Sequence, residues 1–167
     1  MPSILKAAKL GDAAIIKVII DILKKNGINV ISSIIFNPEL SLKRGNYSKV
    51  KPNKSDLIAI KKGKTYLNKL NAYNHVQGLV FRDGNILKTE TSTGTKNMLQ
   101  SIRPDKNKKG ILIKLPKLKQ DLRIDLPTIG LDTLIDCKKA GLKGIVLKHN
   151  KNIFLDKEKC IKFANNN

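Results

Sequence analysis

The fold is decided by the stretch Gln77-Gly78-Leu79-Val80-Phe81-Arg82-Asp83-Gly84-Asn85-Ile86-Leu87-Lys88-Thr89-Glu90. Asp83-Gly84 is a strong turn signal, and a run of strand-forming residues lies on each side of it. The stretch therefore predicts a β-hairpin with strands over 77–81 and 86–90.

Segments with helical periodicity lie on both sides of this hairpin. Behind Asp12, a good N-cap residue, apolar side chains recur at helical spacing, and we expect Gly27 to end that helix. Further helices are expected from Ser55 to about Leu70, over 95–102, over 131–140 and from Asp156 onward. Strands are expected over 28–32, 111–115 and 120–126, with a last hairpin or pair formed by 144–148 and 152–155. The stretch 41–54 reads as a long loop. This interleaving predicts an α/β fold, a mixed β-sheet layered with α-helices in a single domain.

The charge of the chain is extreme, with 33 basic and 13 acidic residues and a net charge of +20. Only four of the basic residues are arginines, and aromatic residues make up 4%. Arginines and stacking aromatics are the groups that grip nucleic acids, so we expect no specific nucleic acid partner. Lysine, asparagine and isoleucine share A/T-rich codons, which explains the bias without a partner. A weak attraction to anionic lipid surfaces needs no specific site.

The chain carries none of the sequence signals of a membrane or secreted protein. No apolar run approaches the roughly 20 residues that span a bilayer, and the first residues lack a signal-peptide core. Cys137 and Cys160 follow no metal-ligand spacing and are expected to be packed thiols in helices. We therefore expect a cytoplasmic protein. His75 and His149 are isolated and are expected to lie on the surface.

Candidate chemistry lies in the stretch Lys114-Leu115-Pro116-Lys117-Leu118-Lys119-Gln120-Asp121-Leu122-Arg123-Ile124-Asp125-Leu126-Pro127. If 120–126 is an extended strand, Asp121, Arg123 and Asp125 share one face, because side chains alternate along a strand. Carboxylates suit Mg²⁺, arginine suits phosphate, and the lysines add positive potential. The pattern therefore suits a phosphate ester or anhydride that is bound with a divalent cation.

Two observations keep an alternative open for this stretch. An arginine that bridges two acids on a solvated strand face would give the same pattern. A straight strand would also hold Asp121 and Asp125 about 13 Å apart, too far for both to ligate one ion unless the chain bends.

The block from Gln120 to Thr133, Gln-Asp-Leu-Arg-Ile-Asp-Leu-Pro-Thr-Ile-Gly-Leu-Asp-Thr, resembles the signature of LpxI-type UDP-2,3-diacylglucosamine pyrophosphatases. Other blocks that resemble the family follow in the same order: Gly11-Asp12, Gln77-Gly78-Leu79-Val80 with Asp83-Gly84, Ala140-Gly141-Leu142-Lys143-Gly144-Ile145, and Leu155-Asp156. The resemblance runs from about Pro2 to about Ala164. It implies that residues 1–10 are a remnant of an interdomain linker, that 11–167 form the C-terminal catalytic-type α/β domain, and that an N-terminal domain is missing.

The resemblance also implies a reaction. Water would attack the α-phosphorus of UDP-2,3-diacylglucosamine with the help of Mg²⁺ or another divalent cation. The products would be UMP and 2,3-diacylglucosamine 1-phosphate (lipid X), an intermediate of lipid A biosynthesis in Gram-negative bacteria. The expected partners are this lipid nucleotide, the missing N-terminal domain and, weakly, the inner-membrane surface. The sequence leaves the oligomeric state open, a homo-oligomer included.

Residue roles are carried over from the resemblance onto matching positions. Asp121 and Asp125 are the expected catalytic carboxylates, and they are the expected metal ligands together with Glu90. The expected substrate contacts are Lys117, Gln120, Arg123, Gly94, Thr95, Thr128 and Thr133.

The chain also departs from the family pattern. It has Thr93-Gly94-Thr95-Lys96 where the family reads Glu-Gly-Thr-Asp, Ala13 in place of an acid, and Leu118-Lys119 in place of Pro-Gly. An impaired remnant or subunit, which binds the precursor without turnover, is therefore the alternative function.

Overall fold

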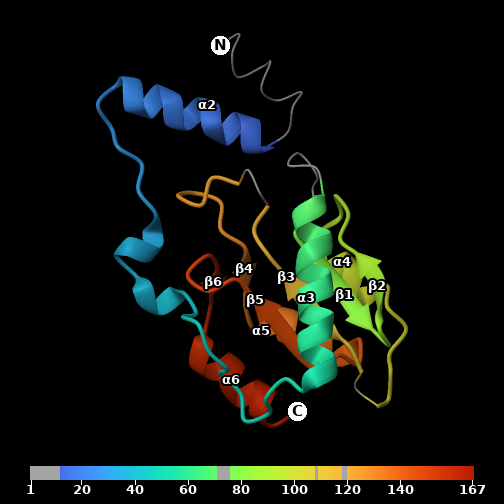
Figure 1. Cartoon of the computed structure of the whole chain (residues 1–167). Coiled ribbons are helices and arrows are strands. Elements are labelled where there is room, and N and C mark those ends of the chain that lie inside the picture. Colours follow the sequence, from blue (N-terminus) through green and yellow to red (C-terminus); the bar gives the residue numbers. More distant parts are fainter. Residues whose placement is uncertain (1–11, 71–75, 108, 118–119) are drawn as a thin grey trace.

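The computed structural model describes residues 12–70, 76–107, 109–117 and 120–167 (Figure 1). Its centre is a four-stranded mixed sheet in the order β2-β1-β3-β5, and β4 and β6 form a separate two-stranded sheet. Helices lie over the main sheet, so the expected α/β architecture is confirmed. The linker assigned to 1–10, Gly11, His75 and the pair Leu118-Lys119 lie outside the described residues.

The predicted hairpin is present, with β1 over Gly78–Arg82 and β2 over Asn85–Thr89. Arg82 pairs with Asn85, and the two residues between them have positive φ angles of 50° (Asp83) and 83° (Gly84). Such a two-residue turn matches the natural twist of the strands, and Asp-Gly adopts it readily. The hairpin is therefore encoded locally.

The core forms where the two faces of β1 and β3 meet helices. Strand β3, Ile111–Lys114, is antiparallel to β1 and parallel to β5, Gly144–Leu147. Leu79 and Ile113 face helix α3, Lys54–Lys69, whereas Val80 and Leu112 face α4 and α5. Helix α4 spans Gly94–Gln100 and α5 spans Leu131–Lys139. The central strands are thus buried on both sides.

The first part of the described chain differs from the expectation. Helix α2, Asp12–Lys25, ends where predicted, because Gly27 has a φ of 77° and Ile28 N–H donates to Leu23 O (3.0 Å). The expected strand over 28–32 is wrong, since these residues pair with no strand of the described chain and Ile28 and Ile31 are exposed. Two short 3₁₀ helices follow, η1 over Ser33–Ile35 and η2 over Pro38–Leu40.

The long loop after Ser41 leads into α3, which begins at Lys54, one residue before Ser55, where we expected the helix to start. The capping residue is Asn53, whose Oδ1 accepts from Asp56 N–H (2.9 Å) while Asp56 Oδ2 accepts from Asn53 N–H (3.0 Å). This reciprocal pair satisfies two backbone donors at the helix start.

The expected last hairpin over 144–148 and 152–155 is wrong. Strand β5 pairs with β3 in the main sheet, whereas β6, Ile153–Phe154, pairs in parallel with β4, Thr128–Ile129. Asn152 is buried between them; it accepts from Leu42 N–H (3.4 Å) and donates to Lys148 O (2.5 Å). These side-chain bonds turn the chain away from β5.

The terminal helix α6, Lys157–Asn165, begins where predicted, but Asp156 makes no side-chain cap and has a φ of 48°. Cys137 and Cys160 are free, buried thiols in α5 and α6, and burial raises the pKa of Cys137 to about 12. Within the described part of the chain, no helix is long and apolar enough to cross a bilayer.

We predict that Gly141→Ala destabilises the fold by about 2 kcal/mol or more. Gly141 ends α5 with a φ of 70°, and an added Cβ would lie under 3.0 Å from backbone atoms of Asp105. Denaturant unfolding measures the loss. Gly84→Ala is the matched control, because Gly84 has a similar φ and no atom within 4 Å of the added Cβ, so it reports strain alone. Equal losses in the two variants would contradict the close approach at Gly141.

Candidate functional site

The strand directions bring the expected site residues to one edge of the main sheet. Strand β1 is antiparallel to β2 and β3, and β3 is parallel to β5, so the carboxyl ends of β2, β3 and β5 lie at the same edge. Glu90 follows β2, Lys114 is the last residue of β3, and the segment 115–127 continues from it. Glu90 and Lys114, which are far apart in the sequence, therefore meet where these strands end.

A buried polar network joins three elements at this edge. Thr95, in the first turn of α4, donates to Glu90 Oε1 (2.6 Å) and accepts from Lys114 Nζ (2.5 Å). Glu90 Oε2 accepts from the backbone N–H of Gln77 (2.9 Å). The exposed fractions of Glu90, Thr95 and Lys114 are only 6%, 9% and 9%. We call these three residues the Glu90–Thr95–Lys114 network.

The ion pair in this network is indirect. Lys114 Nζ lies 3.9 Å from Glu90 Oε1, beyond hydrogen-bond distance, and the Thr95 hydroxyl stands between the two charges. Burial lowers the pKa of Lys114 because the ammonium loses hydration. The Glu90 carboxylate opposes this lowering, and the positive charge of Lys117 adds to it.

The stretch that we expected as a strand over 120–126 forms a turn instead. Backbone N–H groups of Ile124 and Asp125 donate to Asp121 O at 3.2 Å and 2.9 Å. Asp121 Oδ1 accepts from the backbone N–H of Arg123 (3.1 Å), a local bond that competes with strand pairing. We call residues 121–125 the acidic turn.

The acidic turn separates the roles of its two carboxylates. Arg123 grips Asp121 with Nε on Oδ1 (2.9 Å) and Nη2 on Oδ2 (2.6 Å). These hydrogen bonds lower the pKa of Asp121. Asp125 forms no side-chain hydrogen bond or ion pair with the described residues, so Arg123 does not bridge the two acids. The bend also removes the 13 Å separation of a straight strand, because Asp121 and Asp125 share one hydrogen-bonded turn.

Lys117 and Gln120 lie between β3 and the acidic turn. Gln120 Oε1 accepts from the backbone N–H of Lys117 (2.9 Å). Gln120 Nε2 is buried and has no hydrogen-bond partner in the part of the chain that the structure describes. A buried donor without a partner is costly in a folded protein, so this amide is a candidate contact for a ligand.

The remaining expected substrate contacts lie at the start of α4, in β4 and in the first turn of α5. Gly94 begins α4 with a φ of 85°, and its N–H donates to Thr91 O (3.0 Å). Thr128 lies in β4 and donates to Leu126 O (3.1 Å), and Thr133 lies in the first turn of α5. No described hydrogen bond joins Thr128 or Thr133 to the two aspartates. Their substrate contacts stay predictions, as do those of Gly94 and Thr95.

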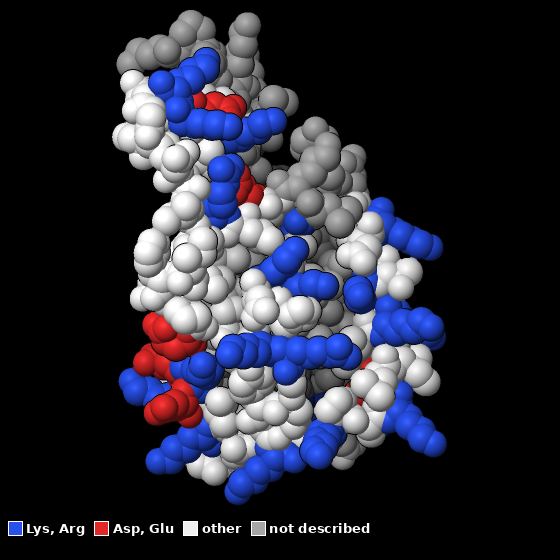
Figure 2. Space-filling model, turned by 60° about the vertical axis from the view of Figure 1, so that its left-hand side comes forward, with Lys and Arg blue, Asp and Glu red and all other residues white. Residues whose placement is uncertain are grey.

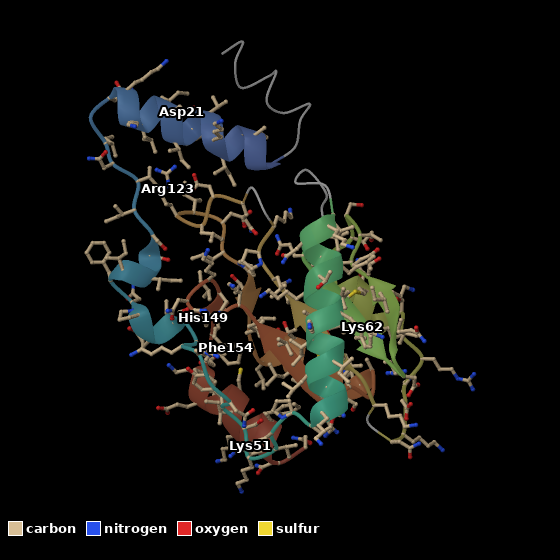
Figure 3. All side chains as sticks on the ribbon, viewed as in Figure 1. Asp21, Lys51, Lys62, Arg123, His149 and Phe154 are labelled. Carbon is tan, nitrogen blue, oxygen red and sulfur yellow. The ribbon has the colours of Figure 1, made fainter. Side chains whose placement is uncertain are left out.

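Positive charge is spread over the face of the protein shown in Figure 2 and does not gather in one patch. Lys and Arg side chains lie across this face, and acidic side chains are few. Arg123 is exposed, and Asp121 and, more weakly, Asp21 raise its pKa. Asp21 belongs to α2, and Figure 3 shows it above Arg123.

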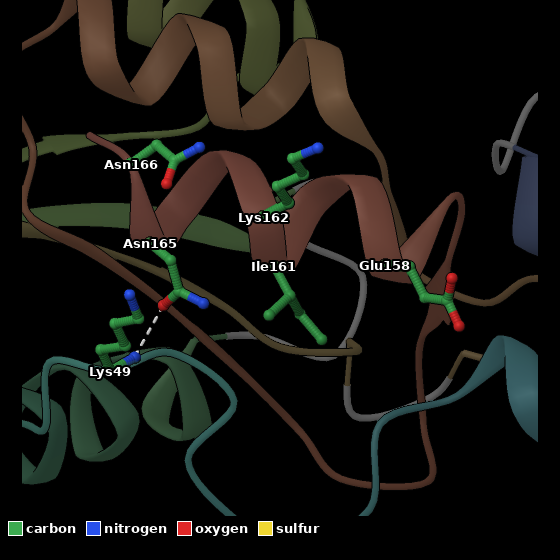
Figure 4. Close-up of a pocket in the computed structure, with 6 residues that line it drawn as sticks. All are labelled: Lys49, Glu158, Ile161, Lys162, Asn165 and Asn166. Atoms are coloured by element: carbon green, nitrogen blue, oxygen red, sulfur yellow. Dashed lines mark hydrogen bonds between the residues drawn. The ribbon is translucent and has the colours of Figure 1, made fainter.

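Two hollows of the surface lie among other residues. One, of about 390 Å³, is lined by Lys49, Glu158, Ile161, Lys162, Asn165 and Asn166 (Figure 4). Lys49 N–H donates to Asn165 Oδ1 (2.7 Å) across it. The other, of about 250 Å³, is lined by Pro38, Glu39, Ser41, Lys43, Tyr47 and Lys157. Neither is lined by an expected site residue, so these hollows do not identify the site.

The fit of a divalent cation differs among the three expected ligands. No group of three or more His, Cys, Asp or Glu side chains with metal-ligand geometry occurs among the described residues. Both carboxylate oxygens of Glu90 already accept hydrogen bonds. Both oxygens of Asp121 also accept hydrogen bonds, from Arg123. Asp125 fits Mg²⁺, which keeps several waters and needs only one or two carboxylates when phosphates supply other oxygens. The metal roles of Glu90 and Asp121 stay predictions that would require these donors to move.

Sequence reasoning missed the place of Lys114, which we treated only as added positive potential. A signal was present, because Lys114 stands inside the run Ile111-Leu112-Ile113-Lys114-Leu115, which reads as a buried strand. A lysine there needs a buried partner, since burying an unpaired charge is expensive. The partner residues, Thr95 and Glu90, are 19 and 24 positions away and could not be identified from periodicity.

We predict that Asp121→Asn lowers the melting temperature at pH 7 by a few degrees at most. The asparagine keeps the acceptor for Arg123 N–H and loses the ion pair, which is partly exposed and therefore weak. Because the pKa of Asp121 is lowered in the folded protein, its contribution is present above the unfolded pKa, about 4. That contribution is lost as the pH falls through the folded pKa.

Thermal unfolding of wild type and Asp121→Asn between pH 7 and pH 2 tests this. The difference should shrink as the pH falls and vanish at the acid end. Arg123→Gln should show the same dependence, because it removes the partner. A difference that persists at the acid end would mean that the aspartate acts other than through its charge.

Comparison with known proteins identifies the family of this chain. It matches the LpxI C-terminal domain family over residues 43–167. It is 31% identical over 172 residues to the UDP-2,3-diacylglucosamine pyrophosphatase LpxI of Caulobacter vibrioides. That alignment covers 98% of this chain and 61% of the relative, so the chain spans about three-fifths of the relative's length. The resemblance inferred from the signature block is confirmed, and the chain belongs to the LpxI C-terminal domain family.

Proposed function

We propose that this chain carries the catalytic chemistry of a UDP-2,3-diacylglucosamine pyrophosphatase. It would hydrolyse the pyrophosphate bond to give UMP and 2,3-diacylglucosamine 1-phosphate, a step of lipid A biosynthesis. The observation that carries the proposal is the acidic turn, where Asp125 has no described partner and Arg123 holds Asp121. The name of the Caulobacter relative gives the substrate.

The residues at this edge of the main sheet have different roles in the proposed reaction. Asp125 is the carboxylate that is free to accept a proton from the attacking water. Asp121 and Asp125 would hold the divalent cation, which when bound neutralises charge on the phosphate oxygens and activates water. Lys117 and Gln120 would contact phosphate oxygens. Arg123 orients Asp121 and is exposed enough to meet the substrate as well.

The substrate and partners extend beyond this chain. The relative is longer, and we propose that an N-terminal domain like that of the family supplies the other part of the lipid-nucleotide site. Cytoplasmic location and weak, peripheral contact with the inner membrane belong to the same proposal, because the substrate is a lipid and the net charge is +20.

The sequence around Thr93 and Lys96 favours a second function, in which the chain binds the precursor without turnover. Thr93 and Lys96 stand where the resemblance led us to expect acids. Thr93 Oγ1 is hydrogen-bonded to Thr91 Oγ1 (2.8 Å), so a neutral hydroxyl pair occupies this corner. If an acid there supports the cation in the family, this chain binds the cation more weakly.

The test of the proposed function is release of UMP from UDP-2,3-diacylglucosamine with Mg²⁺, by the chain alone and with a family N-terminal domain added in trans. We expect release in at least one case, and loss of release when the cation is chelated. Asp125→Asn should lower the rate about a hundredfold or more, because it removes the proton acceptor.

Glu158→Gln is the matched control, since Glu158 is an exposed acid on α6 outside the site. It should leave the rate unchanged. A near-normal rate for Asp125→Asn would remove that residue from the mechanism. No release from folded protein in either arrangement would favour the binding function.

A further inference from the structure

Two buried donors, one on the last residue of β3 and one in the segment after it, have hydrogen-bonding capacity that the described chain does not use. A lysine ammonium has three N–H donors, and among the described residues Lys114 Nζ has one hydrogen-bond partner, Thr95 Oγ1, with Glu90 beyond bonding distance. Gln120 Nε2 is buried and has no partner among the residues that the structure describes. The orientation of this amide follows from its surroundings, since its oxygen must face the N–H of Lys117.

The two donors belong to one local structure. Lys117 connects them, because its backbone N–H is bound by Gln120 and its charge acts on Lys114. The three residues span only the end of β3 and the segment that follows it. Both donors therefore lie on the stretch of chain that leads from β3 into the acidic turn.

The electrostatics of this place favour an anion. Lys114 and Lys117 repel each other, and Glu90 is the acid that acts on Lys114. The side chain of Lys114 is 11% exposed, so its charge is poorly screened by water. A bound phosphate group would relieve this repulsion and satisfy both donors with charge-assisted hydrogen bonds.

We propose that Lys114 is a direct contact for the pyrophosphate of the substrate, in a subsite completed by Gln120 Nε2 and Lys117. Thr95 and Glu90 are positioning residues of this subsite: the hydroxyl holds the ammonium, and the carboxylate keeps it in the interior. The inference rests on the proposed function for the identity of the anion. In this positioning role, both carboxylate oxygens of Glu90 keep the hydrogen bonds that they accept from Gln77 N–H and the Thr95 hydroxyl.

The test measures binding of inorganic pyrophosphate to the whole chain by calorimetry, together with the melting temperature. Lys114→Met should weaken binding about tenfold or more, the effect of losing a hydrogen bond to a charged group. It should also lower the melting temperature, because Glu90 is left buried without its cation. Lys88→Met is the matched control, since Lys88 is an exposed lysine on β2, and it should bind as wild type does.

The double variant Glu90→Gln/Lys114→Met separates contact from positioning. Removing both charges should recover the melting temperature, while binding stays weak because the ammonium is gone. Recovery of binding together with stability would overturn the proposal and leave Lys114 a structural role.

Gln120→Glu supplies an independent variant. It keeps the acceptor for Lys117 N–H and replaces the buried donor by an oxygen. We expect about tenfold weaker binding or worse, with no loss of melting temperature. Unchanged binding would remove Gln120 from the subsite.

The outcomes distinguish this inference from the proposed function. If wild type binds pyrophosphate, Lys114→Met does not, and no UMP is released, the subsite stands and the hydrolytic function fails. If wild type releases UMP and Lys114→Met does so with unchanged kcat and KM, the subsite fails and the function stands. Wild type that does not bind pyrophosphate would also overturn the subsite.

Discussion

A lysine at the end of a fully buried strand is the constraint around which this edge of the protein is built. Lys114 follows Ile113 in β3, and its charge is tolerable in the interior only because Thr95 and Glu90 lie beside it. Those partners come from the first turn of α4 and from the residue after β2. The pairing therefore fixes where three elements end or begin, and it sets the starting point of the segment that carries the expected chemistry.

The segment beyond β3 is shaped by local bonds of its own side chains. Gln120 returns to Lys117, and Asp121 captures both the backbone and the guanidinium of Arg123. The result is a turn in which one acid is engaged and the other, Asp125, has no described partner. Membership of the LpxI C-terminal domain family gives this arrangement a chemical context. Thr93 and Lys96 stand where the family pattern has acids, so the chain departs from that pattern next to this edge of the sheet.

Elements with local signals could be predicted from the sequence. The Asp83-Gly84 turn, the helix end at Gly27 and the helix that stops at Gly141 all depend on residues a few positions apart. The acidic turn could not, because Leu122, Ile124 and Leu126 alternate as a strand would, and the Asp121 bond to Arg123 outweighs that alternation. The pairing partner of β5 could not be predicted either, because the pairing of Ile111 with Gly144 joins residues that are far apart in the sequence. The buried network was missed for the same reason, although a lysine in an apolar run marked its place.

The role given to Lys114 requires a buried ammonium that is held by Thr95 and keeps unused N–H donors, rather than a neutral or solvated side chain. We would measure the ¹⁵N resonance of its Nζ, assigned with Lys114→Arg, during a titration with inorganic pyrophosphate. The account predicts a signal distinct from those of exposed lysines, slow proton exchange with water, and a saturable shift that the Lys88 signal does not share. A signal like that of exposed lysines, or one that stays still while pyrophosphate binds, would contradict it.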